Sequence, residues 1–168
     1  RRPSMIEMKV FGLALDEESQ VPVLILKDLD EKIVLPIWIG AMEAMAISLA
    51  LNEVELPRPM THDLLLNMIH ALDAHVVCVN LTELTEGTYY ANVEVEVEGG
   101  IRRIDSRPSD AVALALRAKA PILVNEAVID QVAKESKEAS VVEFASDDSD
   151  KWTELLERFD PNDTKYKM

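Results

Sequence analysis

The stretch Val93-Glu94-Val95-Glu96-Val97-Glu98, followed by Gly99-Gly100, is the clearest structural signal in the chain. Strict alternation of valine and glutamate is typical of a strand with one apolar face against a core and one acidic face in water. The two glycines supply a tight turn into a second strand, Ile101 to Ile104. The stretch therefore predicts an antiparallel hairpin that is covered on one face.

Strand and helix patterns extend in both directions from this hairpin. An apolar run with a polar interruption at Glu7 and Lys9 predicts a strand at 5–15, because it alternates like one. Further strands are predicted at 21–27, 32–39, 75–81 and 121–124, and the strand of the opening stretch starts at Thr88. Segments rich in alanine and leucine predict helices at 41–52, 61–72, 109–119 and 126–136. The order of these elements predicts an α+β fold with a mixed, mostly antiparallel sheet and helices packed on it.

The helix predicted at 61–72 has a clear start. Thr61 is suited to cap it, and Asp63 falls in the first turn, where the helix dipole favours a negative charge. Its apolar face carries Leu64, Leu65, Met68, Ile69 and Leu72.

Two of the predicted helices have similar sequences. Residues 43–49 (Glu-Ala-Met-Ala-Ile-Ser-Leu) align without a gap with residues 110–116 (Asp-Ala-Val-Ala-Leu-Ala-Leu), and each segment follows a strand. Two helices buried against one sheet need the same alternation of small and large side chains, which is one explanation. The other is an internal pseudo-repeat, in which Glu43 and Asp110 occupy equivalent places and face each other.

Length and composition limit the class of protein. At 168 residues the chain fits one domain, and it has no apolar run near the length of about 18 residues that a membrane span needs. A single cysteine, Cys78, excludes an internal disulfide framework, so we expect a cytoplasmic protein. We divide the chain into residues 1–4 as an addition before a native start at Met5, a domain over 5–136, a linker over 137–150, and a short helix and tail over 151–168.

The net charge of −14 opposes nucleic-acid binding, because such a field repels phosphate groups. A nuclease with this composition needs a locally basic groove or bridging metal ions. The charge does favour solubility.

Four segments, in this order and spacing, resemble the bifunctional nuclease family. They are Leu35-Pro36-Ile37-Trp38-Ile39-Gly40 with Glu43-Ala44, Arg58-Pro59-Met60-Thr61-His62-Asp63-Leu64, Tyr90-Ala91, and Ile104-Asp105-Ser106-Arg107-Pro108-Ser109-Asp110-Ala111. The resemblance implies nuclease activity on RNA and DNA, which is attributed to plant members, and a homo-oligomer, since some members are oligomeric. Several relatives carry a C-terminal UVR-type helical hairpin, which the tail around Trp152 does not resemble.

Two turns carry the candidate chemistry. In 105–110 a strand ends and a helix begins, so free backbone N–H groups together with Arg107 and Ser109 are suited to hold a phosphate. In 58–63 two prolines stiffen the backbone of Arg58, a second phosphate ligand, and His62 lies in a first helical turn, where a neutral imidazole can act as a general base. Each turn has an equally open structural explanation, in which these groups only cap helices and form internal ion pairs.

Acidic side chains in the same turns suggest a hard cation. Glu43, Asp63 and Asp110 are candidate ligands for Mg²⁺ or Mn²⁺, and Asp105 and Asp110 are candidate catalytic carboxylates beside His62. No motif indicates an organic cofactor.

Two functions therefore stay open. The first is a metal-assisted nuclease that cleaves RNA or DNA at these turns. The second is a non-enzymatic oligomeric module that binds a protein or a small anion, with the Arg/Asp turns serving as internal salt bridges.

Overall fold

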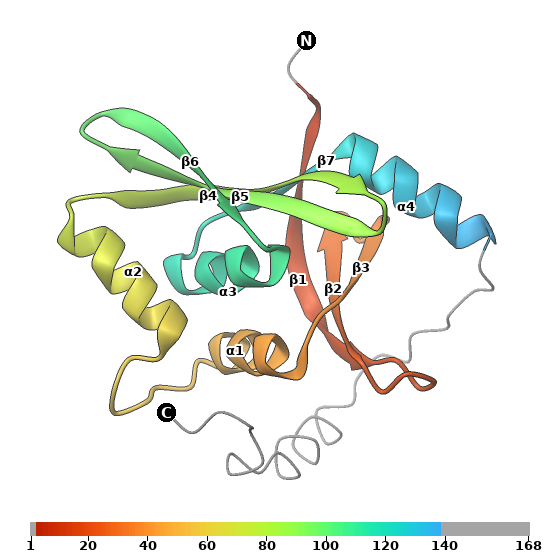
Figure 1. Cartoon of the computed structure of the whole chain (residues 1–168), viewed down its shortest axis with the longest axis horizontal. Helices are drawn as coiled ribbons and strands as arrows, with labels where there is room; N and C mark the ends of the chain where they lie inside the picture. The colour runs from red at the N-terminus through yellow and green to blue at the C-terminus, as the bar shows by residue number, and fades with distance from the viewer. Residues whose placement is uncertain (1–2, 139–168) are drawn as a thin grey trace.

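The computed structural model describes residues 3–138, which form seven strands and four helices (Figure 1). In chain order the elements are β1 (Met5–Leu15), β2 (Pro22–Asp28), β3 (Val34–Trp38), α1 (Ala41–Leu51), α2 (Thr61–Ala71), β4 (His75–Thr85), β5 (Thr88–Val97), β6 (Gly100–Ser106), α3 (Pro108–Ala118), β7 (Ile122–Asn125) and α4 (Glu126–Glu138). The element predicted at 151–168 and most of the predicted linker at 137–150 lie outside the described residues, although α4 runs two residues into that linker.

All seven strands belong to one sheet, in the order β3-β2-β1-β7-β4-β5-β6. Neighbouring strands are antiparallel except β4 and β7, which are parallel. The predicted α+β fold with a mixed, mostly antiparallel sheet is confirmed. Two three-stranded meanders, β1–β3 and β4–β6, each lead into a helix, α1 and α3; the internal pseudo-repeat stays a prediction.

The helices form two unequal layers. Figure 1 shows α1, α2 and α3 on one face of the sheet and α4 on the other. The core between the sheet and the three-helix layer is built from alternate strand residues and from α3: Val112 and Leu114 of α3 belong to the same buried cluster as Leu24, Val79 and Leu81. Helix α3 packs against both α1 and α2, and the first turns of the three helices lie close together. None of the described helices is long and apolar enough to span a membrane.

The hairpin between β5 and β6 turns one residue earlier than predicted. Its two loop residues are Glu98 and Gly99, which have φ angles of 53° and 72°, and Gly100 already pairs with Val97. Left-handed conformations at both loop positions match the right-handed twist of the flanking strands, so the loop stops at two residues.

Helix α2 corrects a second prediction. Met60 takes the N-cap position and Thr61 is already helical, because the Asp63 carboxylate accepts a hydrogen bond from the Met60 N–H at 3.0 Å. Of the predicted apolar face, Ile69 packs against the core. The other four side chains are 41–72% exposed: Leu64, Leu65, Met68 and Leu72.

Candidate functional site

The candidate site lies where three helices begin. Glu43 stands in the first turn of α1, His62 in the first turn of α2, and Asp110 in the first turn of α3, with Arg107 as the N-cap residue of α3. Helix α3 contacts both α1 and α2, so residues far apart in sequence meet at these ends.

Arg107 joins two carboxylates. Its Nε donates to Asp110 Oδ2 at 2.8 Å, and its Nη1 donates to Glu43 Oε1 at 2.9 Å. The Arg107 side chain is nevertheless 63% exposed, so it is accessible from solvent. The two carboxylates raise the pKa of Arg107 further above its ordinary value, so its charge is permanent.

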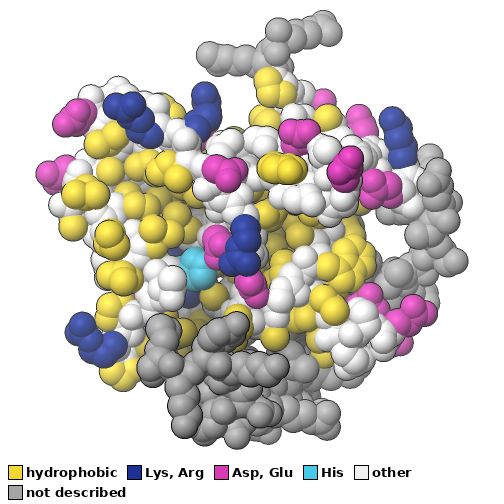
Figure 2. Space-filling model, in the orientation of Figure 1, with side chains coloured by type: hydrophobic (Ala, Val, Ile, Leu, Met, Phe, Trp, Pro, Cys, Tyr) yellow, Lys and Arg dark blue, Asp and Glu magenta, His cyan; other side chains and the backbone are white. Residues whose placement is uncertain are grey.

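His62 extends this set of contacts on the other side of Asp110. His62 Nε2 lies 2.9 Å from Asp110 Oδ1, and the His62 side chain is only 13% exposed. Near the centre of Figure 2 a histidine adjoins an acidic, a basic and a second acidic side chain, which matches the order of the contacts. We call His62, Asp110, Arg107 and Glu43 the four-residue cluster.

The carboxyl group of Asp110 is held in its ionised form. Burial opposes ionisation, but the hydrogen bonds from Arg107 and His62 outweigh it and lower the pKa of Asp110. A carboxylate therefore faces the His62 imidazole at neutral pH.

Local sequence prepares this geometry. Pro108 occupies the first helical position of α3, where its missing N–H costs no hydrogen bond, and Arg107 before it takes the extended backbone that proline favours. At the start of α1, Gly40 has no side chain, and a Cβ there would collide with the Glu43 carboxylate. Glycine at this position lets Glu43 fold back over the helix start.

A second ion pair lies deeper between the helices. Arg117 Nε donates to Asp63 Oδ1 at 2.8 Å, while its Nη1 and Nη2 donate to the carbonyls of Ala113 and Ala46 at 2.8 and 3.0 Å. Arg117 thus connects α1, α2 and α3, and its side chain is 9% exposed. Sequence reasoning missed this residue, although a lone arginine near the end of an apolar helix was a usable signal.

Asp63 was predicted to be a metal ligand, but in the structure both of its carboxylate oxygens accept hydrogen bonds from the protein. Oδ1 accepts from Arg117 and Oδ2 accepts from the Met60 N–H. Burial opposes ionisation here as well, but these partners lower the pKa of Asp63. Together Asp63 and Arg117 line a pocket between the end of α1 and α2.

Three other predicted site residues are not joined to the four-residue cluster. Arg58 is exposed, Asp105 is exposed on β6, and Ser109 is buried; in residues 3–138 no hydrogen bond or ion pair links any of them to it. Asp105 lies on the face of the sheet opposite the buried one, because successive strand residues alternate between faces. It pairs with Asn92, whereas the next residue of β5, Val93, lies on the buried face.

The arrangement does not fit the expected cation. Glu43 and Asp110 already share the Arg107 guanidinium, so a divalent ion between them would face a fixed positive charge. Among the described residues no three His, Cys, Asp or Glu side chains are grouped so as to hold a metal. Mg²⁺ or Mn²⁺ stays a prediction.

Comparison with known proteins bears on this site. Residues 24–137 match the family described as "Bifunctional nuclease domain", a range that contains all members of the four-residue cluster. The chain belongs to this family. The resemblance seen in the sequence motifs is thereby confirmed.

Proteins similar to this bifunctional nuclease domain include a bacterial protein and plant proteins. "Uncharacterized protein Rv1829" of Mycobacterium tuberculosis is 39% identical over 165 residues, which cover 96% of this chain and 99% of that protein. "Bifunctional nuclease 1" of Arabidopsis thaliana is 29% identical over 119 residues, or 68% of this chain and 37% of the plant protein. "Bifunctional nuclease 1" of Oryza sativa subsp. japonica is 28% identical over 99 residues, or 57% of this chain and 30% of that protein. The matched part is therefore about a third of each plant protein.

Proposed function

We propose that this bifunctional nuclease domain binds RNA or DNA and cleaves phosphodiester bonds at the four-residue cluster. The observation that carries the proposal is the 2.9 Å contact between His62 Nε2 and Asp110 Oδ1. An ionised carboxylate against one ring nitrogen fixes the orientation of a histidine and stabilises the imidazolium that forms during proton transfer.

His62 serves as the general base in this scheme. If Nε2 carries the hydrogen and donates it to Asp110, Nδ1 keeps a lone pair and can accept a proton from the attacking water molecule. The new bond then forms between that oxygen and phosphorus, the bond from phosphorus to the leaving oxygen breaks, and the leaving oxygen takes a proton from water. Asp110 stays ionised throughout and balances the charge on His62.

Arg107 supplies the positive charge that a phosphate group needs. Nε and Nη1 are held by Asp110 and Glu43, which orients the guanidinium, and most of the side chain faces solvent. A preoriented arginine binds phosphate oxygens well, and the exposed side chain of Arg107 is suited to this. Glu43 is thus a positioning residue.

No step is assigned to a divalent cation, because the carboxylates expected to bind one are engaged by Arg107. The requirement for Mg²⁺ or Mn²⁺ is a separate prediction. Cleavage assays run with each ion and with a chelator decide it.

The test compares purified full-length chains on labelled single-stranded RNA and DNA. His62→Ala removes the general base and should lower the cleavage rate by about 100-fold or more. Asp110→Asn should also lower it, because the amide cannot stabilise the imidazolium. His70→Ala, an exposed position on the same helix, is the matched control and should retain the rate. Equal cleavage by wild type and His62→Ala would show a contaminating nuclease and overturn the proposal.

A second candidate is a module that binds an anion without cleaving it. It is favoured by the exposed side chain of Arg107, which Glu43 and Asp110 hold in one orientation and which can bind an anion without any reaction. Wild type that binds single-stranded RNA without cleaving it, with binding lost in Arg107→Gln, would support this candidate.

A further inference from the structure

Two aromatic side chains of the described chain have open ring faces. Trp38 at the end of β3 and Tyr90 in β5 are each 46% exposed. The other Phe, Trp and Tyr residues between positions 3 and 138 are Phe11 and Tyr89. The Lys27 ammonium group lies 3.4 Å from the centre of the Phe11 ring, and Tyr89 is partly buried against the core. The rings of Trp38 and Tyr90 are therefore the ones left free to contact a ligand.

Tyr90 is a cross-strand neighbour of Arg107. In the ladder between β5 and β6, Ala91 pairs with Ser106, so the next position sets Tyr90 opposite Arg107. Ala91 is buried, and successive strand residues alternate between faces, so Tyr90 points away from the core. Arg107 has an extended backbone, with a φ of −69° and a ψ of 147°, and continues this alternation past the end of β6. The Tyr90 ring and the Arg107 guanidinium thus leave the sheet on the same side.

Two contacts bring Trp38 to the same place. Tyr89 Oη donates to the Pro36 carbonyl at 3.3 Å, which joins β5 to β3 although these strands are not neighbours in the sheet. Beyond Trp38 in the chain, Glu43 accepts from Arg107 Nη1 at 2.9 Å. Trp38 lies between Pro36 and Glu43, so both contacts tie it to the segments that carry the other open ring and the guanidinium. Figure 2 shows hydrophobic side chains around the charged group at the centre of this face.

The indole of Trp38 is held in one orientation. Its Nε1 donates to Asp16 Oδ2 at 3.1 Å, and Asp16 Oδ1 in turn accepts from the N–H groups of Glu18 and Ser19 at 3.0 and 3.4 Å. The N–H edge of the indole is therefore satisfied by the protein, while much of the ring is open to solvent. A ring that is ordered before binding loses little conformational entropy when a ligand covers it.

We propose that Trp38 and Tyr90 stack on unpaired bases of a single-stranded nucleic acid whose backbone phosphate is bound by Arg107. This inference rests on the proposed function, and it narrows the substrate to strands with unpaired bases. A base inside a duplex is covered on both faces by its neighbours, so only an unpaired base can lie flat on a side chain. Stacking also adds affinity that needs no attraction between opposite charges, which suits a chain of net charge −14.

The first test compares a labelled oligothymidylate with an abasic strand of the same length, by fluorescence anisotropy. Both strands carry the same phosphates, but the abasic strand has no base to stack. All variants are made on the full-length His62→Ala chain, which lacks the general base and leaves the strand uncut. Trp38→Leu and Tyr90→Leu should each weaken binding of the oligothymidylate by about 5- to 100-fold. Neither change should alter binding of the abasic strand.

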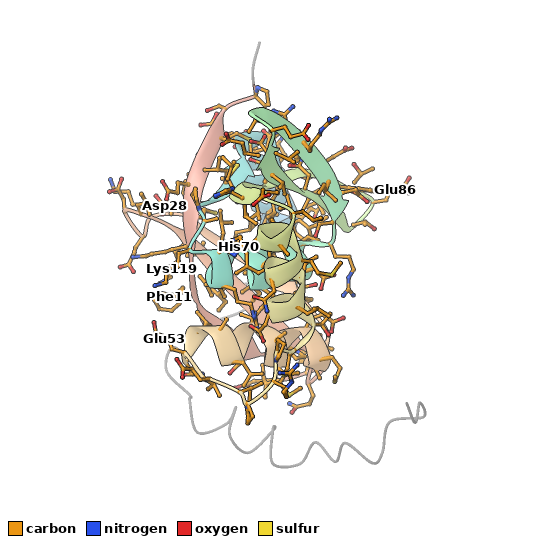
Figure 3. All side chains as sticks on the ribbon, turned by 90° about the vertical axis from the view of Figure 1, so that its left-hand side faces the viewer. Phe11, Asp28, Glu53, His70, Glu86 and Lys119 are labelled. Atoms are coloured by element: carbon orange, nitrogen blue, oxygen red, sulfur yellow. The ribbon has the colours of Figure 1, made fainter. Side chains whose placement is uncertain are left out.

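The controls keep either the ring or the site. Phe11→Leu removes a ring that is 45% exposed, but Figure 3 shows Phe11 on the side of the molecule opposite the face drawn in Figure 2. Phe11→Leu should therefore leave both affinities unchanged. Trp38→Phe and Tyr90→Phe keep an aromatic face and should retain most of the affinity for the oligothymidylate. Circular dichroism checks that each variant is folded.

Arg107→Gln separates this inference from the proposed function. Loss of the guanidinium should weaken binding of both strands, because both carry phosphates. If it does, but Trp38→Leu and Tyr90→Leu do not discriminate between the strands, stacking is overturned and the proposed phosphate site stands. If Arg107→Gln changes neither affinity, the proposed phosphate site fails, and the inference that rests on it fails as well.

The second test observes the contact at Trp38 directly. The chain has two tryptophans, so Trp152→Phe leaves Trp38 as the single emitter. The oligothymidylate should quench this emission, because a base stacks on the indole, whereas the abasic strand and a duplex of the same sequence should not. Trp38→Phe, which keeps Trp152, should show no quenching that depends on bases. Equal quenching by the abasic strand would mean that binding perturbs Trp38 without a stacked base, and it would overturn the proposal.

Discussion

His62 and Asp110 are separated by 48 positions in the chain, yet His62 Nε2 lies 2.9 Å from Asp110 Oδ1. Each residue stands in the first turn of its helix, and the packing of α2 on α3 holds the two turns together. Since Asp110 also binds Arg107, one carboxylate orients both a histidine and an arginine.

Stability should fall in acid through Asp63 and Asp110. Both carboxyls have pKa values lowered by folding, so they stabilise the native state above their ordinary pKa of about 4. That stabilisation should be lost as the pH falls through the lowered values. Thermal unfolding followed against pH should show a shallower acid limb for Asp110→Asn than for wild type. Asp130→Asn, at an exposed position on α4, should keep the wild-type slope.

Gly40→Ala should displace Glu43 without unfolding the protein. The backbone of Gly40 has a φ of −78°, which alanine accepts, but its Cβ would collide with the flexible Glu43 carboxylate. In the cleavage assay Gly40→Ala should match Glu43→Ala, and the double variant should be no slower than Glu43→Ala alone. Gly12→Ala, whose Cβ would meet no atom within contact distance, is the control. Additive losses would show that Gly40 acts by another route.

Arg117→Met should destabilise the fold. The change leaves the Asp63 carboxylate and the Ala46 carbonyl without their hydrogen-bond donor, at a cost of about 1–3 kcal/mol in the free energy of unfolding. Lys134→Met removes the same charge from an exposed site on α4 and should change the free energy by less than about 0.5 kcal/mol. Urea denaturation measures both. Similar values for the two variants would mean that Arg117 does not hold the helices together.

Glu98→Asn should stabilise the hairpin between β5 and β6. Glu98 has a φ of 53°, a conformation that asparagine tolerates better than glutamate, and Asn-Gly is the favoured pair for this two-residue loop. We expect a gain of about 0.5 kcal/mol in urea denaturation. Glu96→Asn, at an exposed position within β5, should give no gain. An equal gain in the free energy of unfolding for Glu96→Asn would show that the loss of a negative charge, and not the loop conformation, causes the effect.

The sequence by itself determined the elements and their class. Alternation in 93–98 gave the buried and exposed faces of β5 because a strand repeats every two residues, and the α+β fold followed from the order of strands and helices. Local chemistry also located the helix starts to within a residue, as at Thr61 and Pro108. The motifs were enough to recognise the family.

Only the tertiary structure decided which charges meet. Arg107 binds Glu43 across 64 positions and Arg117 binds Asp63 across 54, and no local pattern distinguishes these partners from other carboxylates at helix starts. The face of α2 that packs on the core was undetermined for the same reason. Apolar residues lie on much of the helix surface, and only some of them, such as Ile69, pack against the core, while Leu64 and Met68 stay exposed. Periodicity is set by neighbours in the chain, whereas ion pairs and exposed faces depend on how whole helices pack.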